Sequence, residues 1–149
     1  MELNGSRKVL ILDDEEMIAK LVAKWVFWYI SKYTKINLDL QTFTVNANCL
    51  EQVCVAVKSL KPGDLLITDW NMKVVEAPQL LELIPKDSDG KCAFITIMSG
   101  KMNMHDVPER LRAGVILFLS KPFGQKDFCR VLIASEFLPA FESGENGGY

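Results

Sequence analysis

Residues 9–14 read Val-Leu-Ile-Leu-Asp-Asp, an uninterrupted apolar run that ends in two carboxylates. Short continuous apolar runs are typical of strands that are buried on both faces of a parallel sheet. Three further apolar runs are each followed by a polar residue: residues 65–68 by Asp69, residues 94–98 by Ser99, and residues 115–120 by Lys121. Since ligands of parallel sheets bind beyond the carboxyl ends of the strands, we expect these polar residues to share one pocket.

Strands and helices alternate along the chain. We expect strands at Arg7–Leu12, Leu38–Val45, Leu65–Thr68, Cys92–Met98 and Val115–Ser120. We expect helices at Glu15–Tyr33, Cys49–Leu60, Ala77–Ile84, Val107–Ala113 and Lys126–Phe137. Asp14 is expected to cap the first helix and Gly114 to end the fourth. The alternation predicts an α/β fold, a (βα)5 doubly wound five-stranded parallel sheet, with the second strand near its edge.

Composition and charge limit the classes of function. The 149 residues predict one domain at 7–138, with a disordered leader at 1–6 and a flexible tail at 139–149. A net charge of −2 without a basic stripe indicates no direct nucleic-acid partner. No apolar stretch is long enough to span a bilayer, and neither a signal peptide nor zinc-site cysteine spacing is present. We therefore expect a cytoplasmic protein without membrane insertion.

Three carboxylates facing one ammonium group predict a cation site. Asp13, Asp14 and Asp69 with Lys121 carry a summed charge of about −2, and such crowding raises carboxyl pKa values unless a cation neutralises it. Oxygen ligands without histidine or cysteine favour Mg²⁺. An aspartate in such a pocket can attack phosphorus, and the Ser99 hydroxyl can donate to a phosphate oxygen. The pocket therefore fits phosphoryl transfer to an aspartate.

These residues resemble the receiver domain of two-component response regulators, from about Arg7 to Leu138. The signature of that family is an acidic pair after strand 1, a phosphoacceptor aspartate after strand 3, Ser or Thr after strand 4, and Lys-Pro after strand 5. The matching residues here are Asp13-Asp14, Asp69, Ser99 and Lys121-Pro122. Residues 68–72, Thr-Asp-Trp-Asn-Met, are similar to the CheY-like chemotaxis branch. The resemblance implies a flavodoxin-like, CheY-like fold.

The resemblance also implies a division of roles among the site residues. Asp69 would accept a phosphoryl group from a histidine kinase, a phosphotransfer protein or an acyl phosphate. Asp14, Asp69 and the backbone carbonyl of Asn71 would bind Mg²⁺, with Asp13 acting partly through water. Lys121 would pair with the phosphoryl group. The protein would then catalyse only its own phosphorylation and dephosphorylation, and would not be an enzyme with a separate substrate.

A switch and an output face follow from the same resemblance. Ser99 would swing toward the phosphoryl group and Phe118 would move inward with it. The face built from the fourth helix, fifth strand and fifth helix would then bind a downstream protein, and formation of a homodimer is left open. Pro122 is expected to follow a cis peptide bond.

Two stretches depart from the family pattern. Met72-Lys73 stands where Met-Pro is usual, and Glu76-Ala77 stands where Asp-Gly is usual, so we expect this loop to follow a different backbone path. The segment Trp25–Tyr29 is unusually aromatic. It is either an interaction patch for a partner or a second copy, or a longer helix that covers extra core; we favour the second interpretation.

Two other functions are weighed against a single-domain response regulator. A degenerate receiver would act as a scaffold that never takes up phosphate. The altered loop keeps this alternative open, but it is opposed by the retained site residues, Asp13, Asp14, Asp69, Ser99 and Lys121. A phosphatase of the haloacid dehalogenase type would need its nucleophile on strand 1 and a second aspartate two positions later. Glu15 occupies that second position after Asp13, and this argues against the phosphatase.

Overall fold

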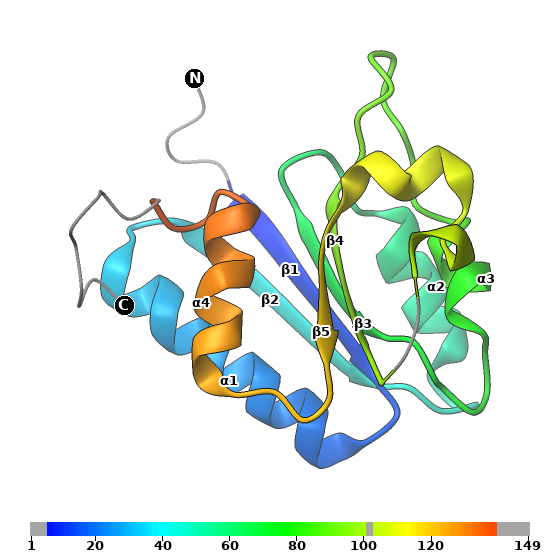
Figure 1. The fold of residues 1–149 in the computed structure, drawn as a ribbon, viewed down its shortest axis with the longest axis horizontal. Coiled ribbons are helices and arrows are strands. Elements are labelled where there is room, and N and C mark those ends of the chain that lie inside the picture. Colours follow the sequence, from blue (N-terminus) through cyan, green and yellow to red (C-terminus); the bar gives the residue numbers. More distant parts are fainter. Residues whose placement is uncertain (1–5, 101–102, 140–149) are drawn as a thin grey trace.

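A computed structural model describes residues 6–100 and 103–139. It contains a five-stranded parallel sheet in the order β2-β1-β3-β4-β5 (Figure 1). The strands are β1 (Ser6–Asp13), β2 (Asn37–Thr44), β3 (Leu65–Asp69), β4 (Phe94–Ser99) and β5 (Val115–Ser120). The α-helices are α1 (Glu16–Tyr33), α2 (Leu50–Lys58), α3 (Ala77–Leu81) and α4 (Gln125–Ala134). The predicted α/β fold and the edge position of the second strand are confirmed.

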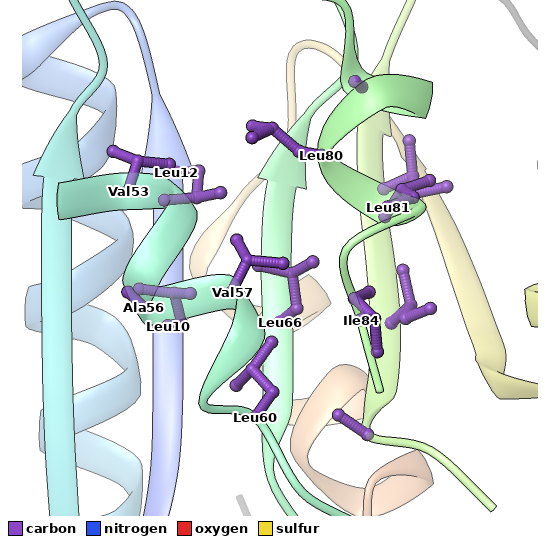
Figure 2. Packing of buried hydrophobic residues seen from close by; sticks show 14 of the residues in the cluster. Leu10, Leu12, Val53, Ala56, Val57, Leu60, Leu66, Leu80, Leu81 and Ile84 are labelled. Atoms are coloured by element: carbon purple, nitrogen blue, oxygen red, sulfur yellow. The ribbon is translucent and has the colours of Figure 1, made fainter. Parts of the chain in front are cut away.

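The sheet separates two apolar layers, with α1 and α4 on one face and α2 and α3 on the other (Figure 1). Successive residues of a strand point to opposite faces, so Leu10 and Leu12 of β1 contact the α2 side while Val9 and Ile11 contact the α1 side. All four of these side chains are fully buried. Figure 2 shows Leu10 and Leu12 among the leucines and valines of β3, α2 and α3. This burial on both faces explains the continuous apolar run.

The start of α1 corrects one prediction. Asp14 does not cap the helix; the N-cap residue is Glu15, and its side chain makes no capping hydrogen bond. Instead, Oδ1 of Asp13 accepts a hydrogen bond of 2.9 Å from the backbone N–H of Glu15. The Asp13 carboxylate therefore fixes the strand-to-helix turn, whereas the Asp14 carboxylate makes no hydrogen bond or ion pair with the residues that the structure describes.

The aromatic segment of α1 divides between core and surface. Tyr29 is buried, and Trp25 packs against Phe128 of α4 with ring centroids 5.6 Å apart. Phe27 and Trp28 remain exposed, at 58% and 41%. Trp25 and Tyr29 therefore contribute to the core, as the favoured interpretation expected. Phe27 and Trp28 do not, and their rings lie on the surface.

The connection between β4 and β5 corrects a second prediction. In place of an α-helix at Val107–Ala113, two 3-10 helices are present, η1 (Met104–Asp106) and η2 (Glu109–Gly114). Pro108 disfavours helical backbone at the residue before it, and Val107 is extended, with φ −86° and ψ 137°. Gly114 ends η2, and a Cβ there would lie 2.7 Å from Sγ of Cys92, so close packing requires the glycine.

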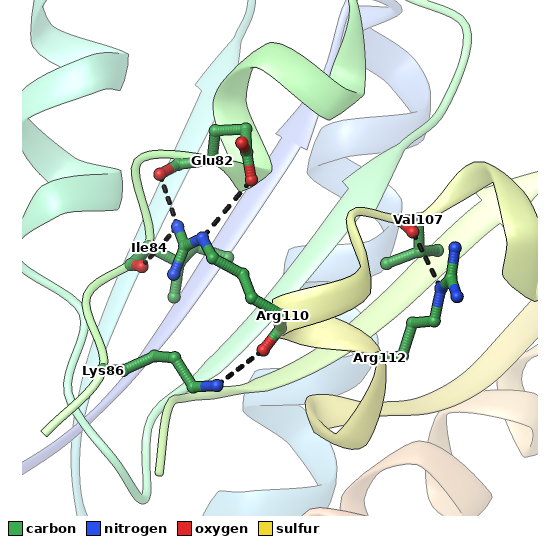
Figure 3. A network of polar contacts seen from close by, with 6 residues as sticks. All are labelled: Glu82, Ile84, Lys86, Val107, Arg110 and Arg112. Atoms are coloured by element: carbon green, nitrogen blue, oxygen red, sulfur yellow. Dashed lines mark hydrogen bonds and ion pairs between the residues drawn. The ribbon is translucent and has the colours of Figure 1, made fainter. Parts of the chain in front are cut away.

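Polar contacts attach η2 to the segment after α3 (Figure 3). The Arg110 guanidinium donates to the backbone carbonyl of Glu82, to that of Ile84 at 3.0 Å and to the Glu82 carboxylate at 3.3 Å. Lys86 Nζ donates to the carbonyl of Arg110 at 2.8 Å. These contacts make η2 a fixed part of the α3 side of the molecule.

The last helix ends earlier than predicted. It stops at Ala134 rather than Phe137, because Glu136 adopts a left-handed φ of 65° that turns the chain back. Arg7 on β1 fastens this turn by donating to the carbonyls of Ser135 and Glu136, and its guanidinium carbon lies 3.7 Å above the Phe137 ring centroid. Among the described residues, no helix has both the length and the apolar character needed to cross a bilayer.

The expected leader and tail lie almost wholly outside the described residues. Ser6 is the exception at one end, where it begins β1, and Pro139 is the exception at the other.

Candidate functional site

Three carboxylates meet at the carboxyl ends of β1 and β3. Asp13 and Asp69 are the last residues of these two neighbouring parallel strands, and Asp14 follows Asp13. One oxygen from each carboxylate lies within 4.8 Å of the others. Asp13 is fully buried, Asp69 is 2% exposed and Asp14 is half-buried. The acidic residues that the sequence placed at strand ends are therefore brought together.

One ammonium group reaches this cluster from β5. Lys121 directly follows the strand, and its peptide bond to Pro122 is cis as expected. Its Nζ lies 3.2 Å from Oδ1 of Asp69, 3.6 Å from Oδ2 of Asp13 and 4.0 Å from Oε1 of Glu15. Sequence reasoning did not assign Glu15 to the site, and the only signal for it was its place directly after the acidic pair.

The cluster holds more negative charge than Lys121 balances. Burial, with the charges of Asp69 and Asp14, raises the pKa of Asp13 to about 6, although the Glu15 N–H and Lys121 oppose this. Burial also raises the pKa of Asp69, although Lys121 and the backbone N–H of Asn71 act to lower it. Both carboxyl groups therefore resist ionisation mainly because they are buried, and the neighbouring carboxylates add to this effect.

One buried carboxylate oxygen, Oδ2 of Asp13, supports a cation site at this cluster. Oδ2 of Asp13 accepts no hydrogen bond from any residue that the structure describes, and the nearest cation is the Lys121 ammonium at 3.6 Å. Buried carboxylate oxygens are normally hydrogen-bonded or bound to a metal. The acidic cluster could therefore hold a metal ion, and its all-oxygen donor set suits a hard divalent cation.

The two predicted switch residues lie on β4 and β5. Ser99 ends β4 at the same edge of the sheet as Asp69, and it is 5% exposed. Its carbonyl accepts a 3.4 Å hydrogen bond from the backbone N–H of Lys121. Phe118 pairs with Ile97 in the register, so it lies further from the carboxyl edge, half-buried against the α2 side. The structure thus places Ser99 at the site edge and Phe118 behind it.

The loop that leaves β3 forms one wall of a cavity of about 590 Å³. Trp70 begins this loop and is held by a 2.9 Å hydrogen bond from its N–H to the carbonyl of Met98. Lys73 is exposed in the cavity wall, and Glu76 leads into α3. Another cavity, of about 470 Å³, includes Phe94 at the opposite end of the sheet, so it does not belong to this site.

The comparisons with known proteins agree with this geometry. The family model described as "Response regulator receiver domain" matches residues 9–133. Chemotaxis protein CheY-3 of Vibrio cholerae is 27% identical over 123 residues, 81% of this chain and 85% of that protein. Chemotaxis response regulator CheY4 of Vibrio cholerae has a TM-score of 0.59 at 20% identity, covering 88% of this chain and 99% of that one. A response regulator receiver domain protein of Clostridium thermocellum has a TM-score of 0.57 at 21% identity, covering 87% and 91%.

A parallel sheet with carboxylates at its central strand ends defines a CheY-like α/β protein. The family match spans most of the chain, and the chain belongs to the response regulator receiver domain family. The structural neighbours confirm the predicted fold class.

Proposed function

We propose that the protein is a single-domain response regulator whose Asp69 accepts a phosphoryl group. A histidine kinase, a phosphotransfer protein or an acyl phosphate would supply that group in the cytoplasm. The observation that supports this most directly is the arrangement of Asp13, Asp14 and Asp69 within 4.8 Å, with Lys121 Nζ 3.2 Å from Asp69. Such a set provides a nucleophile, a cation site and a positive charge in one pocket.

Mg²⁺ is the proposed cofactor, held by Asp13, Asp14, Asp69 and the backbone carbonyl of Asn71. The three carboxylates around one ammonium group support it, as does Oδ2 of Asp13, which accepts no hydrogen bond from the described residues. When bound, the ion would neutralise charge on the transferring phosphoryl group. It would also let the carboxyl groups of Asp13 and Asp69 ionise at neutral pH, because a nearby cation lowers a carboxyl pKa.

In the transfer step, a carboxylate oxygen of Asp69 forms a bond to phosphorus. The bond from phosphorus to the donor's leaving nitrogen or oxygen breaks, and the leaving atom keeps the electron pair. Lys121 would then pair with the phosphoryl oxygens, since its ammonium already lies beside Asp69. The Ser99 hydroxyl would donate to one of these oxygens.

The proposed output is a change on the face formed by η1 and η2, β5 and α4. Phe118 on β5 would move as Ser99 moves toward the phosphoryl group, because the two strands are paired at Ser99 and Ser120. One added charge would thus alter packing at a distance from the site, as in other phosphorylation switches. A downstream protein, or a second copy in a homodimer, would bind this face.

The test is incubation with acetyl phosphate and Mg²⁺, followed by intact-mass measurement. We expect one acid-labile phosphoryl adduct, which is absent in Asp69→Asn and absent when EDTA removes the metal. Asp64→Asn is not a suitable control, because Asp64 is buried and accepts from the N–H of Lys8. The exposed Asp89→Asn is suitable and should leave the adduct unchanged.

Two results would give the protein another function. No adduct with acetyl phosphate or a phosphorylated kinase would favour the scaffold, for which the atypical loop from Met72 to Ala77 is the supporting observation. Steady turnover of a phosphomonoester would favour the phosphatase of the haloacid dehalogenase type.

A further inference from the structure

The outward face of α1 concentrates exposed apolar side chains. Met17, Leu21, Phe27 and Trp28 are exposed at 84%, 39%, 58% and 41%. Elsewhere in the described part of the chain, large exposed apolar side chains occur singly on separate segments, at Val55, Val74 and Met104. Single exposed apolar residues are ordinary, whereas a group on one helix marks a binding surface.

Lysines lie between these apolar side chains. At about 100° per residue, Met17, Leu21, Lys24 and Trp28 form one stripe along the helix. Phe27, Lys20 and Lys32 border this stripe. This face, which we call the α1 outer face, consists of Met17, Lys20, Leu21, Lys24, Phe27, Trp28, Ser31 and Lys32. The acidic Glu16 borders this face at its first turn, where it pairs with Lys20, so the unbalanced positive charge lies toward the other end of the face, at Lys24 and Lys32.

Two of the lysines are not used in ion pairs within the described residues. Lys20 pairs with Glu16 at 3.3 Å, but no ion pair involves Lys24 or Lys32. The Nζ of Lys32 lies 4.6 Å from the centroid of the Trp28 ring. This cation–π contact keeps a positive charge beside an exposed indole ring.

We propose that the α1 outer face binds the surface of an anionic phospholipid bilayer. Negative headgroups complement Lys24 and Lys32, and the interface between headgroups and acyl chains accommodates Phe27 and Trp28. Long lysine side chains extend to the headgroups while neighbouring apolar side chains enter the interface. The binding is peripheral and requires no spanning segment.

Charge and shape exclude a second copy as the main occupant. Two α1 outer faces packed together would set lysines against lysines, and the one bordering acid of each helix, Glu16, already pairs with Lys20 of its own helix. The lysines and apolar side chains also alternate along a convex helix, and a fluid headgroup layer fits such a mixture without needing matched pockets.

Bilayer binding leaves the acidic site accessible. Trp28 lies roughly 18 Å along the helix axis from Glu16, which begins α1 beside the acidic pair. The aromatic and basic end of the α1 outer face is therefore remote from Asp69. The protein could take up a phosphoryl group while its α1 rests on a membrane, so this inference does not depend on the proposed function.

Vesicle co-sedimentation of the full chain tests the proposal. We expect binding to phosphatidylcholine vesicles that contain phosphatidylserine and no binding to pure phosphatidylcholine vesicles. Binding should weaken as salt rises, because the attraction is screened. Lys24→Gln and Lys32→Gln should each reduce affinity by about fivefold, and Trp28→Ser should reduce it further.

Matched controls come from α2, which carries an exposed valine and an exposed lysine. Val55→Ser and Lys58→Gln should leave vesicle binding unchanged. Far-UV circular dichroism checks that every variant is folded, and the acetyl phosphate reaction of the same variants reports the acidic site separately. Equal binding by the α1 and α2 variants, or no binding to anionic vesicles, would overturn the proposal. The proposal would also be overturned if the α1 outer face bound an acidic protein rather than vesicles, and if the α1 variants lost that binding.

Discussion

At the scale of single residues, Asp13 combines three tasks. Its Oδ1 fixes the turn into α1, its Oδ2 faces Lys121, and its main chain ends strand β1. Burial raises its pKa from 3.8 to about 6, so the folded protein binds the carboxyl proton more tightly than the unfolded chain. The stability that this proton provides is fully present below pH 3.8 and is lost as pH rises through about 6.

The raised pKa of Asp13 predicts how the stability of the metal-free protein changes with pH. Between pH 4 and pH 7, wild type should lose up to about 3 kcal/mol of unfolding free energy relative to Asp13→Asn, which has no proton to lose. Urea unfolding in EDTA across this pH range measures the difference. Mg²⁺ at pH 7 should recover stability in wild type but much less in the variant. Parallel pH curves for the two proteins would contradict the raised pKa, and exposed Asp89→Asn should follow wild type.

The sequence was sufficient to place most residues of the candidate site. Asp13, Asp69, Ser99 and Lys121 could be predicted because each follows a continuous apolar run, and parallel strands bring such ends together. Glu15 could not, because only the three-dimensional position of Lys121 brings it within 4.0 Å. Their chemical roles stay predictions.

At the scale of elements, the segment between β4 and β5 depends on contacts that are distant in sequence. Val107 and Leu111 are spaced as in an α-helix, but the predicted helix at Val107–Ala113 is replaced by η1 and η2. Pro108 was a local signal against it. The contacts of Arg110 were not predictable, because its partners Glu82 and Ile84 are 28 and 26 positions away.

Removing this side chain should loosen η2. Arg110→Ala should lower the unfolding free energy by about 1–2 kcal/mol, since three hydrogen bonds from a partly exposed guanidinium are lost. Amide hydrogen exchange should accelerate in residues 104–114. Urea unfolding and exchange mass spectrometry measure the two effects.

The control for that experiment is Arg130→Ala, because within the described residues Arg130 pairs only with Asp127 of its own helix. It should cost less than about 0.5 kcal/mol. Arg110→Lys keeps the charge but not the forked geometry, so it should resemble Arg110→Ala in exchange. Wild-type exchange in the lysine variant would show that charge alone holds η2.

At the scale of the whole molecule, Arg7 joins three distant parts of the chain. From β1, its guanidinium donates twice to the carbonyl of Gly63, at 2.9 and 2.6 Å. The same group donates to the carbonyls of Ser135 and Glu136, at 3.0 and 2.9 Å. The first strand, the turn before β3 and the turn after α4 are therefore fastened at the end of the sheet opposite the acidic cluster.

Arg7→Ala should consequently destabilise the whole fold by about 2–4 kcal/mol, because partly buried carbonyls lose a charged donor. Thermal unfolding should show one cooperative transition at a lower temperature. Arg7→Lys should restore only a small part, and Lys58→Ala on the α2 surface should change little. A separate early transition of the C-terminal segment, with the main transition unmoved, would show that Arg7 holds only the C-terminal turn.

The order of the strands has a consequence for synthesis of the protein. The acidic pair leaves the ribosome with β1, whereas Lys121 follows β5, the last strand to emerge. A nascent or truncated chain that lacks β5 thus has its carboxylates but not the ammonium that balances them. If Asp69 is phosphorylated as proposed, only a chain that has been synthesised and folded to β5 could be phosphorylated. Incomplete chains would therefore not respond to the kinase.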